Sequence, residues 1–297
     1  MDLQLNRTNG SPHQELSYAQ NSAIQANSIS KTLHITKDAL EGLYSTMKPK
    51  CVTIAELGCA YGPNTLMIVP ELIRVTIEKF KEKEVPKMHV PDDLFDKDGA
   101  SLLKGYMYIV ETSPPEACIA YQKQFATDFT AFLKCPGEEV IEGGRMIINI
   151  MLTSETHGPH QFWIIKLMNM VIHDMLKEGL VDEEKANNFN MPFYPPTVDE
   201  VNKLVVDQGS FFIDKHETFS VLWDVPMLEL RDGIDELKRA RFVAGPAIAV
   251  AEYMISENFG EGVAKEFFRR FIELVRKFLS AGDKFYTFHQ VVSLIRK

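Results

Sequence analysis

The chain has 297 residues, of which 45% are hydrophobic and 25% charged, and its formal net charge at pH 7 is −9. This length and balance are typical of one large or two small globular domains. An acidic chain of this kind has no general attraction to nucleic acid or to an anionic membrane surface, although a locally neutral pocket can still accept an anionic substrate.

The first half of the chain alternates between helical and strand patterns. Apolar residues recur at helical spacing over 17–48, and the β-branched run 52–57 predicts a buried strand. A glycine-rich turn over 58–62 leads into a second helical pattern, 63–83, which one internal proline interrupts. Residues 84–104 are charged and irregular.

Residues 105–111 alternate weakly, which predicts another strand. Pro114 and Pro115 then introduce a helix whose aromatic residues share one face. A Gly-Gly pair precedes the apolar run 145–152, which predicts a further buried strand. This alternation predicts a parallel sheet with helices on both faces.

The second half is mostly helical, with two returns to strand. The expected elements are a helix over 160–178, a loop over 183–196, a strand over 210–223, helices over 234–257 and 261–280, and a terminal strand over 285–295. We interpret this half as a helical cap that the chain leaves twice to rejoin the sheet.

The four cysteines, Cys51, Cys59, Cys118 and Cys135, are well separated and form no Cys-x-x-Cys pair. This spacing is atypical of a zinc site or a disulfide framework and favours a reducing compartment. The first residues have no apolar stretch like that of a secretory signal, and no apolar run reaches the ~20 residues of a membrane span. We therefore expect a cytoplasmic protein.

The strongest local motif runs from Glu56 to Asn64 (ELGCAYGPN), where a buried strand ends in an acidic residue and a glycine-rich turn opens a helix. Cofactors bind beyond the carboxyl ends of strands in doubly wound folds, and glycine lets the backbone approach them. Ala60 breaks the dinucleotide fingerprint, and no Gly-Lys-Ser/Thr follows. A cofactor without phosphate, such as S-adenosylmethionine, fits better, and a tight turn that binds no ligand is the alternative.

Several motifs together indicate a family. The runs SYAQNSAIQ, ELGCAYGPNT, ETSPPEA, GGRMI, NFNMPFYPP, ENFGEG and VVSLIRK, in that order, resemble the SABATH family of plant carboxyl and N-methyltransferases over nearly the whole chain. The resemblance implies an α/β fold, a Rossmann-like methyltransferase sheet with an α-helical cap, and a homodimer. We expect 1–157 to form the N-terminal arm and methyltransferase core, completed by 205–223 and 284–297. Residues 158–204 and 224–283 would then form the cap.

The implied reaction is methyl transfer from S-adenosylmethionine to the carboxylate of a small acid resembling salicylate, benzoate, jasmonate or indole acetate. A carboxylate is already ionised at pH 7, so no catalytic base is expected and the rate depends on positioning. N-methylation of a purine alkaloid, of the theobromine or caffeine type, is one alternative. A catalytically inactive homologue that only binds a ligand or partner is another.

The resemblance and the glycine-rich turn also assign residues. Those expected at the cofactor are Tyr18, Ser22, Glu56, Gly58, Cys59, Gly62 and Asn64. Those expected at the substrate are Tyr18, Gln25, Trp163, Trp223 and Val250, with Gln25 and Trp223 positioning the acid. For the two tryptophans, simple core packing is the alternative.

The chain also departs from the family. A long family segment is missing between Lys83 and Gly105, which removes the acid that binds the ribose, the adenine contacts and half of the substrate pocket. Asp92, or its neighbour Asp93, is the candidate replacement for that acid.

Some relatives also bind magnesium. The matching residues here are Asn187, Phe189 and Asn190, with Asn187 in the place of an acidic ligand and Leu103 in the place of a distant Asn. The loss of charged oxygen ligands weakens such a site.

Overall fold

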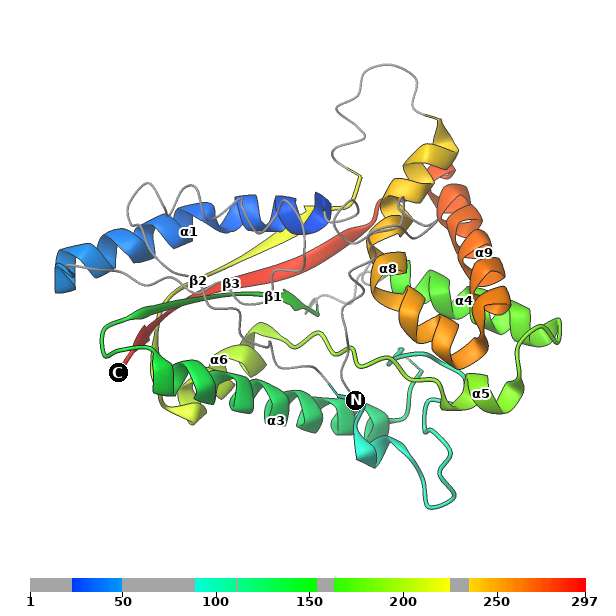
Figure 1. Cartoon of the computed structure of the whole chain (residues 1–297), viewed down its shortest axis with the longest axis horizontal. Helices are drawn as coiled ribbons and strands as arrows, with labels where there is room; N and C mark the ends of the chain where they lie inside the picture. Colours follow the sequence, from blue (N-terminus) through cyan, green and yellow to red (C-terminus); the bar gives the residue numbers. More distant parts are fainter. Residues whose placement is uncertain (1–22, 50–88, 111, 154–162, 225–234) are drawn as a thin grey trace.

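The structure is a computed structural model that describes residues 23–49, 89–110, 112–153, 163–224 and 235–297 (Figure 1). Its elements, in chain order, are α1 (Ala23–Met47), the 3-10 helix η2 (Asp92–Leu94), α3 (Pro115–Glu139), β1 (Arg145–Leu152), α4 (Trp163–Lys177), α5 (Glu183–Asn188), α6 (Val198–Gln208), β2 (Phe211–Leu222), α8 (Glu236–Phe259), α9 (Glu261–Ser280) and β3 (Tyr286–Arg296). All three strands agree closely with the expected ranges 145–152, 210–223 and 285–295.

The described strands form a three-stranded sheet in the order β1-β3-β2, and both neighbouring pairs are antiparallel. The parallel sheet expected from the first half is therefore not found in this part of the chain. The reason lies where β2 ends: the backbone N–H of Trp223 donates to the carbonyl of Phe285 at 3.0 Å. The chain re-enters the sheet at the end where β2 left it, so β3 must run in the opposite direction. The expected strand over 52–57 lies outside the described residues.

Each face of the sheet is covered by helices. Figure 1 shows α1 along one face and α3 with α6 along the other. Alternate residues of β3 point to opposite faces: Val292 and Leu294 join the apolar cluster that contains Phe129 of α3 and Val205 of α6, whereas His289 contacts α1. The α3 face carries most of the apolar contacts, although Gln290 of β3 donates to Asn202 of α6 on that side, and the α1 face carries the polar contact between His289 and Ser28.

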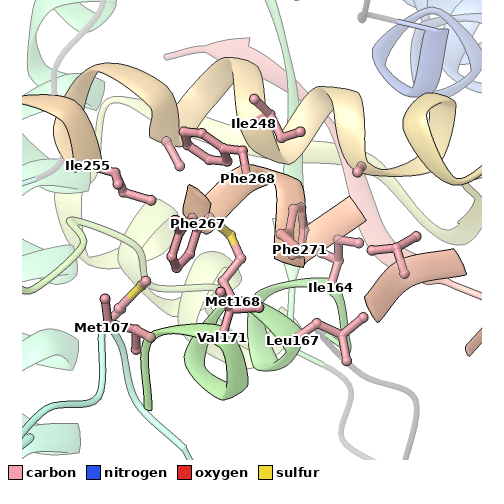
Figure 2. Close-up of a cluster of buried hydrophobic side chains, with 14 of the residues drawn as sticks. Met107, Ile164, Leu167, Met168, Val171, Ile248, Ile255, Phe267, Phe268 and Phe271 are labelled. Carbon is pink, nitrogen blue, oxygen red and sulfur yellow. The ribbon is translucent and has the colours of Figure 1, made fainter. Parts of the chain in front are cut away.

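Helices α4, α8 and α9 form a second layer beside the sheet, at the end where β2 finishes (Figure 1). Figure 2 shows their apolar side chains pointing toward one another: Ile164, Leu167, Met168 and Val171 of α4, Ile248 and Ile255 of α8, and Phe267, Phe268 and Phe271 of α9. Gly260, with a φ of 89°, makes the reversal between α8 and α9. All three helices lie within the ranges 158–204 and 224–283 that were expected to form the helical cap.

The expected strand over 105–111 is wrong for the described residues 105–110. Gly105 has a φ of 87° and Lys104 a φ of 46°, both in the left-handed region, so the chain turns there. The backbone N–H of Met107 donates to the side chain of Asn169 at 2.9 Å instead of to a neighbouring strand. Burial of Met107 in the helical layer produced the strand-like pattern.

Two helices were not expected. The predicted loop over 183–196 begins with α5, which Asp182 caps by accepting from the backbone N–H of Lys185 at 2.9 Å. Helix α6 begins with a capping box in which Thr197 and Glu200 satisfy each other's backbone N–H groups. It packs against α3 and β2, so the expected domain boundary at 204/205 falls inside a single helix. None of the helices within the described ranges is both long and apolar enough to cross a bilayer.

Candidate functional site

The predicted site residues are only partly covered by the structure. Those outside the described residues are Tyr18, Ser22, Glu56, Gly58, Cys59, Gly62 and Asn64. Trp163 is the first residue of α4. The geometry of the site therefore depends on Gln25, Trp223, Val250 and Asp92.

Gln25 lies in the first turn of α1, directly after the polar segment that the family resemblance assigns to the cofactor. The side-chain oxygen Oε1 is buried and has no hydrogen-bond partner among the described residues. A buried acceptor without a donor costs about 1–3 kcal/mol, so native proteins leave few of them. The orphaned oxygen fits a position that a ligand's donor group completes.

Trp223 directly follows β2 and is 7% exposed. Its indole Nε1–H donates to Oγ1 of Thr287 at 3.2 Å, and its backbone N–H donates to Phe285. Ile24, the neighbour of Gln25, belongs to the same buried apolar cluster as Trp223. The structure thus brings the start of α1 and Trp223 to one region, where the sheet meets the helical layer.

Val250 and Asp92 are placed differently. Val250 lies on α8 and is 54% exposed. Asp92 is exposed on η2, whose Leu94 packs against Ala117 and Tyr121 of α3. Because α3 and α1 cover opposite faces of the sheet, the structure does not bring Asp92 together with Gln25 (Figure 1).

A polar network near Trp223 was missed by sequence reasoning. The Nε2 atom of His289 lies 3.0 Å from Oγ1 of Thr287, and its Nδ1 atom lies 3.3 Å from Oγ of Ser28 on α1. The side-chain amide of Asn149 on β1 donates to Oγ of Ser28 at 2.8 Å. Burial lowers the pKa of His289 to about 4, so the ring is neutral at pH 7. The period-two placement of Thr287 and His289 on a terminal strand was the only sequence signal for it.

A buried ion pair was also missed. Both Nε and Nη2 of Arg239 on α8 donate to Oδ2 of Asp224, the residue after Trp223. The Asp224 side chain is 2% exposed, and its other oxygen, Oδ1, has no partner within the described part of the chain. The pair fixes the end of β2 to the first turn of α8.

The magnesium candidates lie at the end of α5. The side-chain oxygens of Asn188 and Asn190 accept hydrogen bonds from Ser101, from its backbone N–H at 3.3 Å and its hydroxyl at 2.9 Å. Phe189 is buried against Phe259 at a ring-centroid distance of 5.2 Å. Oδ1 of Asn187 lies close to Gly105. No group of three or more His, Cys, Asp or Glu side chains gathers within the described ranges, so the oxygens offered at Asn187 and Asn190 are neutral amides, which bind a hard cation more weakly than carboxylates do.

Known proteins resemble this chain over its whole length. A family profile described as SAM dependent carboxyl methyltransferase matches residues 4–90 and 87–297. The match divides at 87–90, inside the stretch between Lys83 and Gly105 where the sequence lacks a family segment. This confirms the expected internal deletion, as does the length of 297 residues against ~350 for the homologues.

Individual methyltransferases and a caffeine synthase are also similar to this chain over nearly its full length. The salicylate carboxymethyltransferase of Clarkia breweri is 31% identical, and the alignment covers 95% of this chain and 96% of that protein. A benzoic acid/salicylic acid carboxyl methyltransferase of Petunia hybrida is 29% identical over 99% of this chain and 98% of its own. A probable caffeine synthase of Coffea canephora is 28% identical, with 95% of each chain covered.

The fold has a solved counterpart. A structure titled loganic acid methyltransferase with SAH superposes with a TM-score of 0.76 at 21% identity, covering 97% of this chain and 98% of that one. This likeness confirms the expected methyltransferase fold with its helical cap. Together with the family match on both sides of residues 87–90, it leads to one conclusion: the chain belongs to the family of S-adenosylmethionine-dependent carboxyl methyltransferases.

Proposed function

We propose that this chain methylates the carboxylate of a small, largely apolar acid, of the salicylate, benzoate or jasmonate kind, to give its methyl ester. The single observation that carries the choice of site is the buried, unpartnered amide oxygen of Gln25, on the helix whose first turn packs into the cluster containing Trp223. The names of the Clarkia and Petunia relatives support a carboxylic acid as the acceptor.

When bound, S-adenosylmethionine supplies the methyl group of its sulfonium, whose S–CH3 bond breaks as a carboxylate oxygen forms the O–CH3 bond of the ester. Gln25 would donate from its amide nitrogen to the other carboxylate oxygen. An ionised carboxylate only accepts hydrogen bonds, so the buried Oε1 would accept instead from an N–H or O–H group of the cofactor or from a hydroxyl group of the acid. Trp223 and Trp163 pack against the apolar part of the acid and exclude water. No residue removes a proton, because the acid is ionised beforehand.

The segment from residue 17 to residue 22 and the turn from Glu56 to Asn64 hold the cofactor in this proposal. Residues 1–157 with 205–223 and 284–297 act as the core, and 158–204 with 224–283 as the cap, except that the whole of α6 belongs to the core because it packs against α3 and β2. Asp92, exposed on η2, stays a candidate for the ribose contact that the deleted segment supplies in relatives.

The proposed reaction uses no magnesium. Asn188 and Asn190 already bond to Ser101, and a hard cation prefers carboxylate oxygens. Addition of Mg²⁺ or of EDTA should therefore leave the initial rate unchanged, and a rise with Mg²⁺ would reinstate a site around Asn187.

We further propose a cytoplasmic homodimer. Val250, which the family resemblance assigns to the substrate pocket, and Tyr253 lie one helical turn apart on α8 and are 54% and 56% exposed. We assign this exposed side of α8 to the contact between subunits instead. Light scattering on the purified full chain measures the oligomeric state, and a single mass near 33.8 kDa would contradict the dimer.

The enzymatic proposal is tested in two steps. Calorimetry measures binding of S-adenosylmethionine to the full chain, and transfer of a radiolabelled methyl group is then followed with salicylate, benzoate, jasmonate, indole acetate and a methylxanthine. Ester formation from at least one acid is expected. Binding without transfer to any acceptor would indicate an inactive homologue, and labelling of the methylxanthine alone would favour N-methylation, which the Coffea relative supports.

The Gln25→Ala variant should raise the KM for the acid while the Kd for S-adenosylmethionine changes less. Gln122→Ala is the matched control, because Gln122 lies on α3 and bonds only to Glu200 among the interactions found for it. Equal kinetics for Gln25→Ala and wild type would remove Gln25 from the site.

A further inference from the structure

A line of hydrogen-bonded side chains crosses the face of the sheet that α1 covers. It begins at the indole N–H of Trp223, passes through Oγ1 of Thr287 and both ring nitrogens of His289, and ends at Oγ of Ser28. Asn149 completes the bonding of Ser28 from β1. The line therefore joins α1, β1, β3 and the end of β2.

The middle of this line is buried and packed against an aromatic ring. Ser28 and Thr287 are each 3% exposed and His289 is 8% exposed. The His289 ring stacks on Phe219, its cross-strand partner on β2, with ring centroids 5.4 Å apart and an interplanar angle of 8°. A neutral ring has one donor and one acceptor nitrogen. Each hydroxyl can therefore complement one ring nitrogen, in either tautomer.

One end of the line is Trp223, which is proposed to hold the acid, and the other end, Ser28, lies one helical turn from Gln25, the second residue proposed to hold it. Ser28 lies three residues after Gln25, so both side chains lie on one side of α1. Trp223 has its indole fixed by Thr287. Apolar side chains would join the helix to the sheet at least as strongly, whereas a satisfied polar network fixes a particular rotation and register.

We propose that His289 is a positioning residue for methyl transfer, whose ring fixes the Gln25 end of α1 relative to the indole of Trp223. This inference rests on the proposed function, because it assigns Gln25 and Trp223 to the acid. His289 itself touches neither the acid nor the cofactor in this arrangement.

The physical link is tested without reference to activity. The chain has two tryptophans, so Trp163→Phe leaves Trp223 as the single tryptophan, whose emission is selected over that of the nine tyrosines by the excitation wavelength. In that background, Thr287→Val and His289→Phe should both shift the Trp223 emission, because each changes the environment of the indole N–H. Emission identical to the parent in both variants would overturn the link.

The functional part is tested in the otherwise native chain. His289→Phe keeps the stacking on Phe219 but removes both ring nitrogens, and we expect a ~10-fold or larger fall in kcat/KM for the acid, with the Kd for S-adenosylmethionine within twofold of wild type. Ser293→Ala is the matched control, because Ser293 is a buried polar residue on the same face of β3, farther from Trp223. It should retain the wild-type kcat/KM.

Two further variants separate positioning from general stability. His289→Gln can reach Thr287 in place of Nε2, and His289→Asn can reach Ser28 in place of Nδ1. The Gln variant should restore the Trp223 emission, because it restores the bond to Thr287, whereas the Asn variant should restore part of the acid KM, because it restores the bond to Ser28 on α1. If both variants behave like His289→Phe, or if all three retain wild-type kcat/KM, the positioning role is wrong while ester formation by the wild type still stands. If the wild type methylates no acid, the proposed function fails and the positioning role fails with it.

Discussion

His289 is a titratable group that the fold buries in its neutral form. Burial lowers its pKa to about 4, compared with 6.5 in an unfolded chain. Between pH 6.5 and pH 4, His289 is therefore mostly protonated in the unfolded chain and mostly neutral in the folded chain. The stability that this residue provides is complete above pH 6.5 and is lost as the pH falls toward 4.

We expect the free energy of unfolding to be about 2 kcal/mol lower at pH 5 than at pH 7 because of this residue alone. Urea unfolding of wild type and His289→Phe at both pH values measures it as the difference between their pH dependences. An equal fall in both proteins would mean that His289 is protonated in the folded state.

Trp223 combines an apolar ring with one hydrogen bond, and the two can be separated. Trp223→Phe keeps most of the ring but leaves Thr287 without the indole donor. We expect the KM for the preferred acid to rise and the ranking of acids to change, with little effect on S-adenosylmethionine affinity. Calorimetry and a panel of acids measure this, and a uniform loss that follows cofactor affinity would contradict a substrate role.

For individual residues, the family resemblance predicted that Gln25 and Trp223 belong to the site. It did not predict the hydrogen bonds that link Trp223, Thr287, His289 and Ser28. The pairing of Ser28 with His289 joins residues 261 positions apart, and no local pattern reveals such a contact. The Asp224–Arg239 pair was missed for a related reason, since its burial depends on where α8 packs.

Among the elements, those with a strong apolar period were predictable. The strands β2 and β3 and the helices α8 and α9 lie within a few residues of the expected ranges. The structure of residues 105–110 was not predictable in this way. The strand-like pattern there comes from burial against helices, and the left-handed residues Lys104 and Gly105 turn the chain. Helix α6 was missed although its Thr-x-x-Glu capping box is visible in the sequence.

Two glycines make a matched test of turn and helix geometry. A Cβ on Gly144 would lie 2.6 Å from Cγ1 of Val140 and 2.8 Å from the carbonyl oxygen of Ile141, so the turn into β1 must shift. A Cβ on Gly262, in the first turn of α9, would meet open space. We expect Gly144→Ala to destabilise the chain by about 1–3 kcal/mol.

Gly262→Ala should instead stabilise it by up to about 1 kcal/mol, because alanine loses less backbone freedom on folding. Thermal unfolding of both variants checks the pair, and a lower Tm for Gly262→Ala would show that α9 starts differently.

On the scale of the whole molecule, the Asp224–Arg239 pair connects the sheet to the helical layer. Arg239→Met would leave the Asp224 carboxylate buried without its partner, and we expect a loss of about 3 kcal/mol. Adding Asp224→Asn removes the charge and should recover at least half of that loss. Lys123→Met is the control, since Lys123 and Asp93 form an exposed pair whose loss should change stability far less.

Urea unfolding measures all four proteins. If Arg239→Met lowers the free energy of unfolding no more than Lys123→Met does, the Asp224 carboxylate has another partner in the folded chain.

The order of the described strands has a consequence for biosynthesis. β3 lies between β1 and β2 in the sheet, yet it follows both of them in the chain. During translation, β1 and β2 therefore emerge before β3, which hydrogen-bonds to both of them. Until then, their unpaired backbone groups can pair with strands of other nascent chains. Residues 286–296 thus join the two other described strands, so a frameshift or stop codon before them should yield aggregate rather than a shortened enzyme.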